Sequence, residues 1–118
     1  MILALEAIFG NRSAANVMMF IQSYGSGYAS EIARTFETPI SVVQDQLKRL
    51  EGEGVLVSRT LGRTRVFEFN PRNPTVSRLQ RFLVEELDAL PRELVKKYFR
   101  TRQRPRRSGK SLAARSDE

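Results

Sequence analysis

The chain has 118 residues, which is room for one folded domain with a single hydrophobic core. It contains no cysteine and no histidine, so a disulfide framework and the usual zinc, copper and haem ligands are excluded. The formal net charge is +7, but seven basic residues from Arg100 onward face only Asp117 and Glu118, so residues 1–99 carry only +2. The high charge is mostly a property of the tail and does not by itself indicate a nucleic-acid partner.

The composition also limits location and chemistry. No apolar run approaches the roughly 20 residues that span a bilayer, and the start MILALEAIF lacks a basic region and a cleavage site, so we expect a cytoplasmic protein with no membrane partner. We do not expect an enzyme, because the chain has no histidine base, no cysteine nucleophile, no phosphate-binding glycine loop and no acidic cluster placed for a metal. We therefore expect no cofactor.

Three short helices are predicted before residue 37, over residues 2–9, 13–24 and 30–36. The first ends at Gly10, a normal signal for a helix C-terminus. Ser13 is placed to cap the second helix, which ends at the GSG of residues 25–27. Ser30 is placed to cap the third.

A fourth helix, residues 39–52, is predicted to follow the turn ETP. Thr38 offers a hydroxyl at the cap position, and Pro39 suits the first helical position because it has no amide hydrogen to leave unpaired. One face of this helix is apolar and is expected to pack on the core, with Ile40, Val43, Leu47 and Leu50. The other faces carry Ser41, Val42, Gln44, Asp45, Lys48 and Arg49.

The hydrophobic period then changes from helix to strand. VLVSRT and RTRVFEF are rich in β-branched and aromatic residues and are separated by LG, which predicts an antiparallel hairpin over residues 55–69 with a short turn at Gly62. Phe67 and Phe69 are expected in the core. The hairpin closes at NPRNP, residues 70–74, because two prolines forbid a continuing strand.

A long helix is predicted over residues 75–90. Pro91 breaks or kinks it, and RELVKKYF adds two more turns. From about residue 101 the composition offers almost nothing to bury, which predicts disorder. We therefore divide the chain into a domain, residues 1–99, and a basic tail, residues 100–118.

The element order predicts a mainly α fold with a small β-hairpin wing, a winged helix-turn-helix with N- and C-terminal flanking helices. From YASEIARTF onward the chain resembles winged-helix transcription regulators of the ArsR-like group, most specifically in LKRLEGEGVLV followed by a charged glycine turn and an aromatic strand. IFGNR and NPRNP further resemble small winged-helix proteins associated with nucleotidyltransferases.

The resemblance implies a repressor or activator that binds double-stranded DNA, usually as a homodimer paired through its terminal helices. The second helix of the motif would enter the major groove, and the hairpin would lie on the backbone or in the minor groove. Metal-sensing members use cysteine and histidine, so that role does not carry over.

The residue types suggest a role for each exposed position. Ser41 and Gln44 can reach base edges, Val42 can contact a thymine methyl group, and Asp45 can accept from the cytosine N4 amine. Lys48 and Arg49, one helical turn further along, and the arginines of the hairpin can bind DNA phosphates. The candidate DNA-binding residues are Thr38, Ser41, Val42, Gln44, Asp45, Lys48, Arg49, Arg59, Arg63 and Arg65.

Several interpretations stay open. Asp45 is either a base-reading residue or a surface partner of Arg49 four residues on. The hairpin arginines either contact DNA or protect an exposed strand edge. The whole domain is either a DNA reader or an interaction module that docks on a protein partner such as a nucleotidyltransferase. A dimer interface is expected to use Leu5, Ile8, Phe9, Leu79, Phe82, Leu83 and Leu87.

Overall fold

The structure is a computed structural model that describes residues 3–99. The elements are α1 (Leu3–Phe9), α2 (Arg12–Tyr24), α3 (Ala29–Phe36), α4 (Ile40–Gly52), β1 (Leu56–Leu61), β2 (Thr64–Phe69), α5 (Pro74–Ala89), α6 (Arg92–Leu94) and the π-helical turn η1 (Val95–Phe99). The predicted helices and hairpin are thus present. The predicted disorder of the tail lies outside the described residues.

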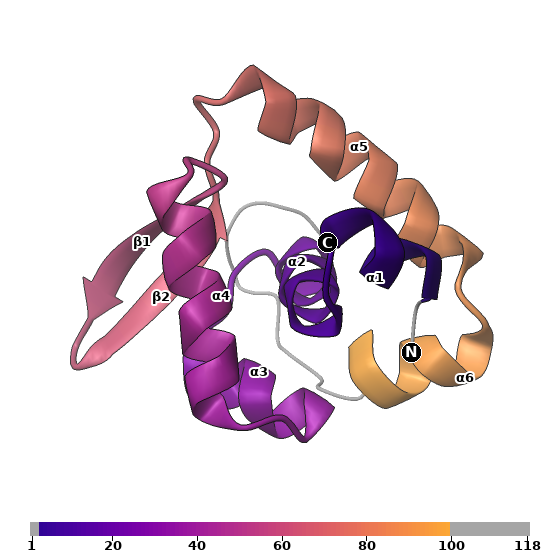
Figure 1. The fold of residues 1–118 in the computed structure, drawn as a ribbon, viewed down its shortest axis with the longest axis horizontal. Helices are drawn as coiled ribbons and strands as arrows, with labels where there is room; N and C mark the ends of the chain where they lie inside the picture. The colour runs from indigo at the N-terminus through magenta and orange to yellow at the C-terminus, as the bar shows by residue number, and fades with distance from the viewer. Residues whose placement is uncertain (1–2, 100–118) are drawn as a thin grey trace.

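Helix α2 lies at the centre of the domain, with α1, α3, α4, α5, β2 and η1 packed around it (Figure 1). Every residue from Ala14 to Ile21 is buried, so α2 is covered on all sides rather than along one stripe. This helix is the framework on which the outer helices and the hairpin are placed.

The start of α2 differs from the prediction. Asn11, not Ser13, is the N-cap: its side chain accepts a 2.6 Å hydrogen bond from the Ala14 backbone amide. Gly10, with φ of 87°, ends α1 in the left-handed region and leaves Asn11 in the extended conformation that a cap requires. The prediction that Ser13 caps the helix is therefore wrong.

Helices α3 and α4 are joined by a tight turn. The turn passes through Glu37, whose φ is 52°, and its amide bonds to the carbonyls of Ala33 and Arg34. Pro39 occupies the N-cap of α4, and the Thr38 hydroxyl donates to the Phe36 carbonyl at 3.1 Å. Thr38 therefore stabilises the turn. The prediction that Thr38 caps α4 and that Pro39 takes its first helical position is wrong. Ser30 likewise is not a cap, because α3 already begins at Ala29 after Tyr28.

The hairpin turns at Gly62, as predicted, but its two-residue loop lies one residue further along the chain than the predicted LG. Leu61 pairs with Thr64, so Gly62 and Arg63 form the loop. Gly62 has a φ of 64°, which places a glycine where a type II′ turn needs a positive φ. A third segment extends this sheet, because Gly27 exchanges two backbone hydrogen bonds with Phe67, of 3.0 and 2.8 Å.

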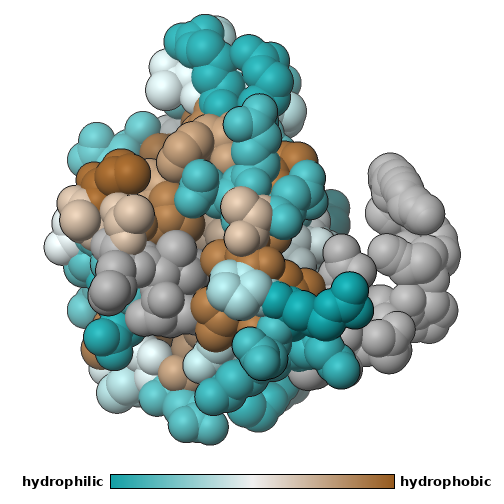
Figure 2. Space-filling model, turned by 90° about the vertical axis from the view of Figure 1, so that its right-hand side faces the viewer, coloured by the Kyte–Doolittle hydropathy of each residue, from teal (hydrophilic) through white to brown (hydrophobic). Residues whose placement is uncertain are grey.

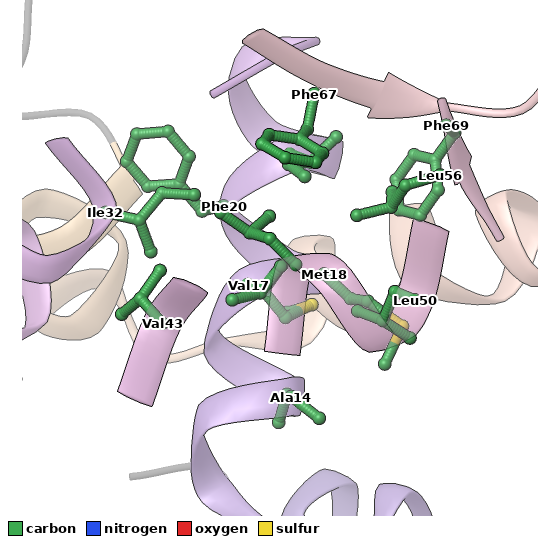
Figure 3. Close-up of a cluster of buried hydrophobic side chains, with 14 of the residues drawn as sticks. Ala14, Val17, Met18, Phe20, Ile32, Val43, Leu50, Leu56, Phe67 and Phe69 are labelled. Carbon is green, nitrogen blue, oxygen red and sulfur yellow. The ribbon is translucent and has the colours of Figure 1, made fainter. Parts of the chain in front are cut away.

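The core lies between α2, α4 and the hairpin. Val43, Leu47 and Leu50 of α4 are buried as predicted, but Ile40 is 44% exposed because it lies at the open first turn. Leu56, Phe67 and Phe69 point from the hairpin toward Val17, Met18 and Phe20 of α2 (Figure 3). The burial of Phe67 and Phe69 confirms that they are core residues.

The C-terminal helices return to the domain. Asn73 caps α5 by accepting from the Thr75 amide at 3.1 Å, and Pro91 separates α5 from α6. The predicted two further turns are present, although residues 95–99 form a π-helical turn. Tyr98 stacks on Phe36 of α3, with ring centroids 5.1 Å apart, and the Ser23 hydroxyl donates to the Phe99 carbonyl. The end of the domain is thereby attached to the helix-turn-helix side.

Candidate nucleic-acid interface

The outer face of α4 is mostly polar and exposed. While its apolar face is buried against the core, all six of the predicted outward positions are exposed: Ser41, Val42, Gln44, Asp45, Lys48 and Arg49. Thr38 is half-buried, and its hydroxyl is engaged in the turn. The structure therefore brings six of the seven candidate helix residues to one surface and leaves Thr38 at its edge.

The side chain of Asp45 does not pair with Arg49. The Arg49 guanidinium donates to the Gln46 side-chain oxygen through Nε at 3.2 Å and Nη2 at 2.9 Å. Among residues 3–99, Asp45 takes part in no ion pair within 4.0 Å. The Asp45–Arg49 interpretation is thus not the arrangement in this structure, and the Asp45 carboxylate is left accessible in the middle of the helix.

The three hairpin arginines do not share a surface. Cross-strand partners lie on the same face of a hairpin and successive residues alternate. Arg59 pairs with Val66 and Arg65 pairs with Thr60, so Arg59 and Arg65 lie on opposite faces. Arg63 lies in the turn between them.

The environments of these arginines differ as well. Arg59 Nη1 lies 4.0 Å from Glu68 Oε2, and both side chains are exposed, so this contact is a weak one. Arg65 donates through Nε to the Ser58 hydroxyl at 3.1 Å. Arg63 is exposed and has no hydrogen-bond or ion-pair partner within the described part of the chain.

Sequence reasoning missed a polar connection between the hairpin and α4. The Ser58 hydroxyl donates to Glu51 Oε2 at 2.6 Å while it accepts from Arg65. The turn at Gly62 was a usable signal, because a two-residue loop places Ser58 and Arg65 on the same face. The contact between Ser58 and Glu51 was not predictable in the same way, because it depends on how the hairpin packs against α4.

The predicted dimer residues fall into three groups. Leu5 and Leu83 have 0% exposure and belong to the core of this chain, so they cannot contact a partner directly. Phe9, Leu79 and Leu87 are partly buried against the same core. Ile8 and Phe82 are exposed, at 63% and 37%. Val84 of α5, which was not among the predicted residues, is 43% exposed.

Figure 2 views the molecule from the side of α6 and the C-terminal half of α5 and shows hydrophobic side chains at the surface among hydrophilic ones. This side lies away from α4 and the hairpin, which sit side by side in Figure 1. A second surface besides the polar face of α4 is therefore accessible for contacts. Among residues 3–99, no group of three or more carboxylates could hold a metal ion, and no helix there is long and apolar enough to span a membrane.

The two helices of a tight helix-turn-helix, α3 and α4, followed by an antiparallel hairpin that packs on the second helix, define a winged helix-turn-helix domain. This confirms the predicted fold class.

Among known proteins, the matches to this chain are solved structures. No protein-family model matches the chain, and no curated protein matches its sequence. A structure described as the AntR antimony-specific transcriptional repressor is similar, with 17% sequence identity, a TM-score of 0.48, and coverage of 75% of this chain and 78% of that chain. The winged helix-turn-helix assignment follows from the elements of the chain itself.

Proposed function

We propose that this protein is a sequence-specific regulator of transcription that binds double-stranded DNA. The observation that carries the proposal is the accessible polar face of α4 beside a hairpin with basic residues. An α-helix is about 10–12 Å wide with its side chains, and the major groove is about 12 Å wide. Helix α4 would enter the major groove, and the hairpin would lie on the backbone or in the minor groove.

The exposed residues of α4 would have two roles, base contacts in the first turns of the helix and phosphate contacts further along it. Ser41 and Gln44, in its first turns, would donate to or accept from base edges, and Val42 would contact a thymine methyl group. The Asp45 carboxylate would accept from the N4 amine of cytosine, a role that needs an unpaired acid. Lys48 and Arg49 would bind phosphates that fix the position of the helix.

We further propose that two copies of the chain associate through α5. Arg78 and Arg81 are exposed in the first half of this helix, and Glu85 and Asp88 are exposed in the second half. If two α5 helices pack antiparallel, each basic half faces the acidic half of the other copy. The exposed Phe82 beside these charges would supply apolar contact. A homodimer of this kind would read a near-palindrome with half-sites about one helical turn, or a multiple of it, apart.

The experiment that tests this function is selection of bound duplexes from a random DNA pool at roughly 150 mM salt, where non-specific electrostatic binding is weak. We expect an enriched near-palindrome, and sedimentation should give a dimer mass that falls on dilution. Enrichment of no sequence would refute sequence-specific recognition. A monomer mass at every concentration would refute the dimer but would not contradict sequence-specific binding to DNA.

A second candidate function is docking on a protein partner such as a nucleotidyltransferase. The observation in its favour is apolar exposure on the helix-turn-helix and the hairpin: Ile40 and Val42 are 44% and 37% exposed on α4, and Leu61 is 54% exposed near the hairpin turn. If no duplex is enriched, a photoreactive residue in place of Val42 should crosslink to that partner in cells. Crosslinks to DNA instead would argue for the first function.

A further inference from the structure

Three side chains from three different elements form a continuous polar connection. Glu51 lies in the last turn of α4, Ser58 in β1 and Arg65 in β2. The Ser58 hydroxyl uses its single proton to donate to Glu51 Oε2, at 2.6 Å, and it accepts from Arg65 Nε at 3.1 Å. The shorter distance is typical of a hydroxyl bound to an ionised carboxylate, which is among the stronger hydrogen bonds in proteins.

The position of this connection along the hairpin decides what it holds. At the base of the hairpin, Leu56 and Phe69 are buried in the core. Ser58 lies two pairs further out, opposite Phe67, and all residues from 59 to 65 are exposed. The Glu51–Ser58–Arg65 connection is therefore the outermost link between the hairpin and α4 among the hydrogen bonds of residues 3–99.

The charges of this connection also separate the roles of the arginines. The positive charge of Arg65 is offset by the negative charge of Glu51, joined to it through one hydroxyl. Such a connection adds little to the release of counterions from DNA, because the protein gains no net positive charge there. Arg63 has no acidic partner in the described residues and extends from the turn.

We propose that Arg65 is a positioning residue that fixes the angle between the hairpin and α4 through Ser58 and Glu51, and that Arg63 is the phosphate contact of the hairpin. The proposal rests on the DNA-binding function proposed above. It assigns to Arg65 control of selectivity, because a hairpin at the wrong angle prevents α4 and the hairpin from meeting their two grooves together. It assigns to Arg63 a contribution to affinity that every sequence shares.

The positioning role is tested first without DNA. Since the chain has no cysteine, Gln44→Cys on α4 and Thr64→Cys at the hairpin turn give two unique positions for spin labels. We expect a single narrow distance distribution in the otherwise unchanged protein and in Arg63→Ala. Ser58→Ala and Arg65→Ala should broaden it. The same narrow distribution in all four proteins would overturn the positioning role, whether or not the protein reads DNA.

The consequence for recognition is tested by salt titration of unlabelled variants on the selected duplex and on an unrelated duplex. Arg63→Ala should reduce the slope of log affinity against log salt by about 0.9. It should weaken binding to the selected and the unrelated duplex by the same factor. Arg65→Ala and Ser58→Ala should leave the slope unchanged and lower the ratio of selected to unrelated binding by about three- to ten-fold, the effect of one hydrogen bond. A slope reduced by about 0.9 in Arg65→Ala, with no loss of selectivity, would overturn the proposal.

Glu51→Gln is the conservative control, because its amide oxygen can still accept from Ser58 while its charge is removed. We expect selectivity to be kept and the salt slope to rise, since the charge of Arg65 is no longer offset. A variant that had lost its fold would not combine kept selectivity with a higher salt slope. As a direct check of folding, the far-ultraviolet circular dichroism spectrum of each variant should match that of the parent protein. If the unchanged protein shows no preference between duplexes, the proposed function fails, and the spin-label distances still decide whether the connection positions the hairpin.

Discussion

Gly27 is the position at which the smallest change should disturb both the core and the hairpin. A Cβ atom added there would lie 2.9 Å from Cε1 and 3.0 Å from Cδ1 of Phe20, and 3.2 Å from Cδ1 of Ile32. Phe20 and Ile32 are 0% and 1% exposed, so neither side chain can move outward freely. The backbone of Gly27 is also held, by its two hydrogen bonds to Phe67 of β2.

The expected cost of Gly27→Ala is the difference between two effects. Forcing one carbon atom into a filled core costs about 1–3 kcal/mol. Against this, alanine restricts the unfolded chain and stabilises the protein by about 0.4–1 kcal/mol. The free energy of unfolding should therefore fall by about 1–2 kcal/mol.

Urea denaturation followed by circular dichroism measures this change, and Gly52→Ala is the matched control. Gly52 lies in the last turn of α4 with no atom within 4 Å of an added Cβ, so the same substitution there should be neutral or stabilise by up to about 1 kcal/mol. Removing the ring in Phe20→Leu should make Gly27→Ala less costly, a coupling that a double-mutant cycle detects. A Gly27→Ala protein as stable as the parent would refute the packing argument.

Three other predictions concern base reading by α4, the α5 dimer and the two hydrogen bonds of Asn73. Asp45→Ala should leave the urea midpoint unchanged and remove a cytosine preference from the selected duplex, and a retained preference in a repeated selection would count against base reading. Arg81→Glu and Glu85→Arg should each weaken the dimer by roughly ten-fold, whereas their mixture should form a heterodimer in sedimentation; dimers unaffected by either change would exclude the antiparallel α5 arrangement. Asn73→Asp should keep the cap of α5 but lose donation to the Gly54 carbonyl, so it should cost less stability than Asn73→Ala, and equal losses in urea would contradict two separate roles.

The predictions from sequence succeeded where a repeating pattern decides the structure. The spacing of Val43, Leu47 and Leu50 fixes which face of α4 is buried, and the outward positions follow from it. Gly62 fixes where the hairpin turns, although the loop consists of Gly62 and Arg63 and not of the predicted Leu61 and Gly62. Ile40 fits the same apolar spacing but remains exposed, because the first turn of the helix extends beyond the surface that covers the rest.

The predictions failed where two neighbouring residues can make the same hydrogen bond and the structure uses only one of them. Ser13 and Asn11 are both good caps, and the left-handed Gly10 decides between them by ending α1 one residue before Asn11. Arg49 has Asp45 and Gln46 within reach along the helix, and in the structure its guanidinium bonds to Gln46. Charge and spacing alone do not rank such alternatives, because the backbone conformation decides the first of them and the side-chain rotamer of Arg49 decides the second.

One residue of the loop after the hairpin joins the two surfaces on which the proposed function depends. Asn73 accepts from the Thr75 amide, which caps α5, and donates through Nδ2 to the Gly54 carbonyl at 3.1 Å, just after the end of α4. Asn70 donates to the same carbonyl at 3.0 Å. The start of the proposed dimer helix is therefore fixed relative to the end of the proposed reading helix. In a dimer built on α5, this attachment would set the distance between the two copies of α4, and with it the half-site spacing that the protein accepts.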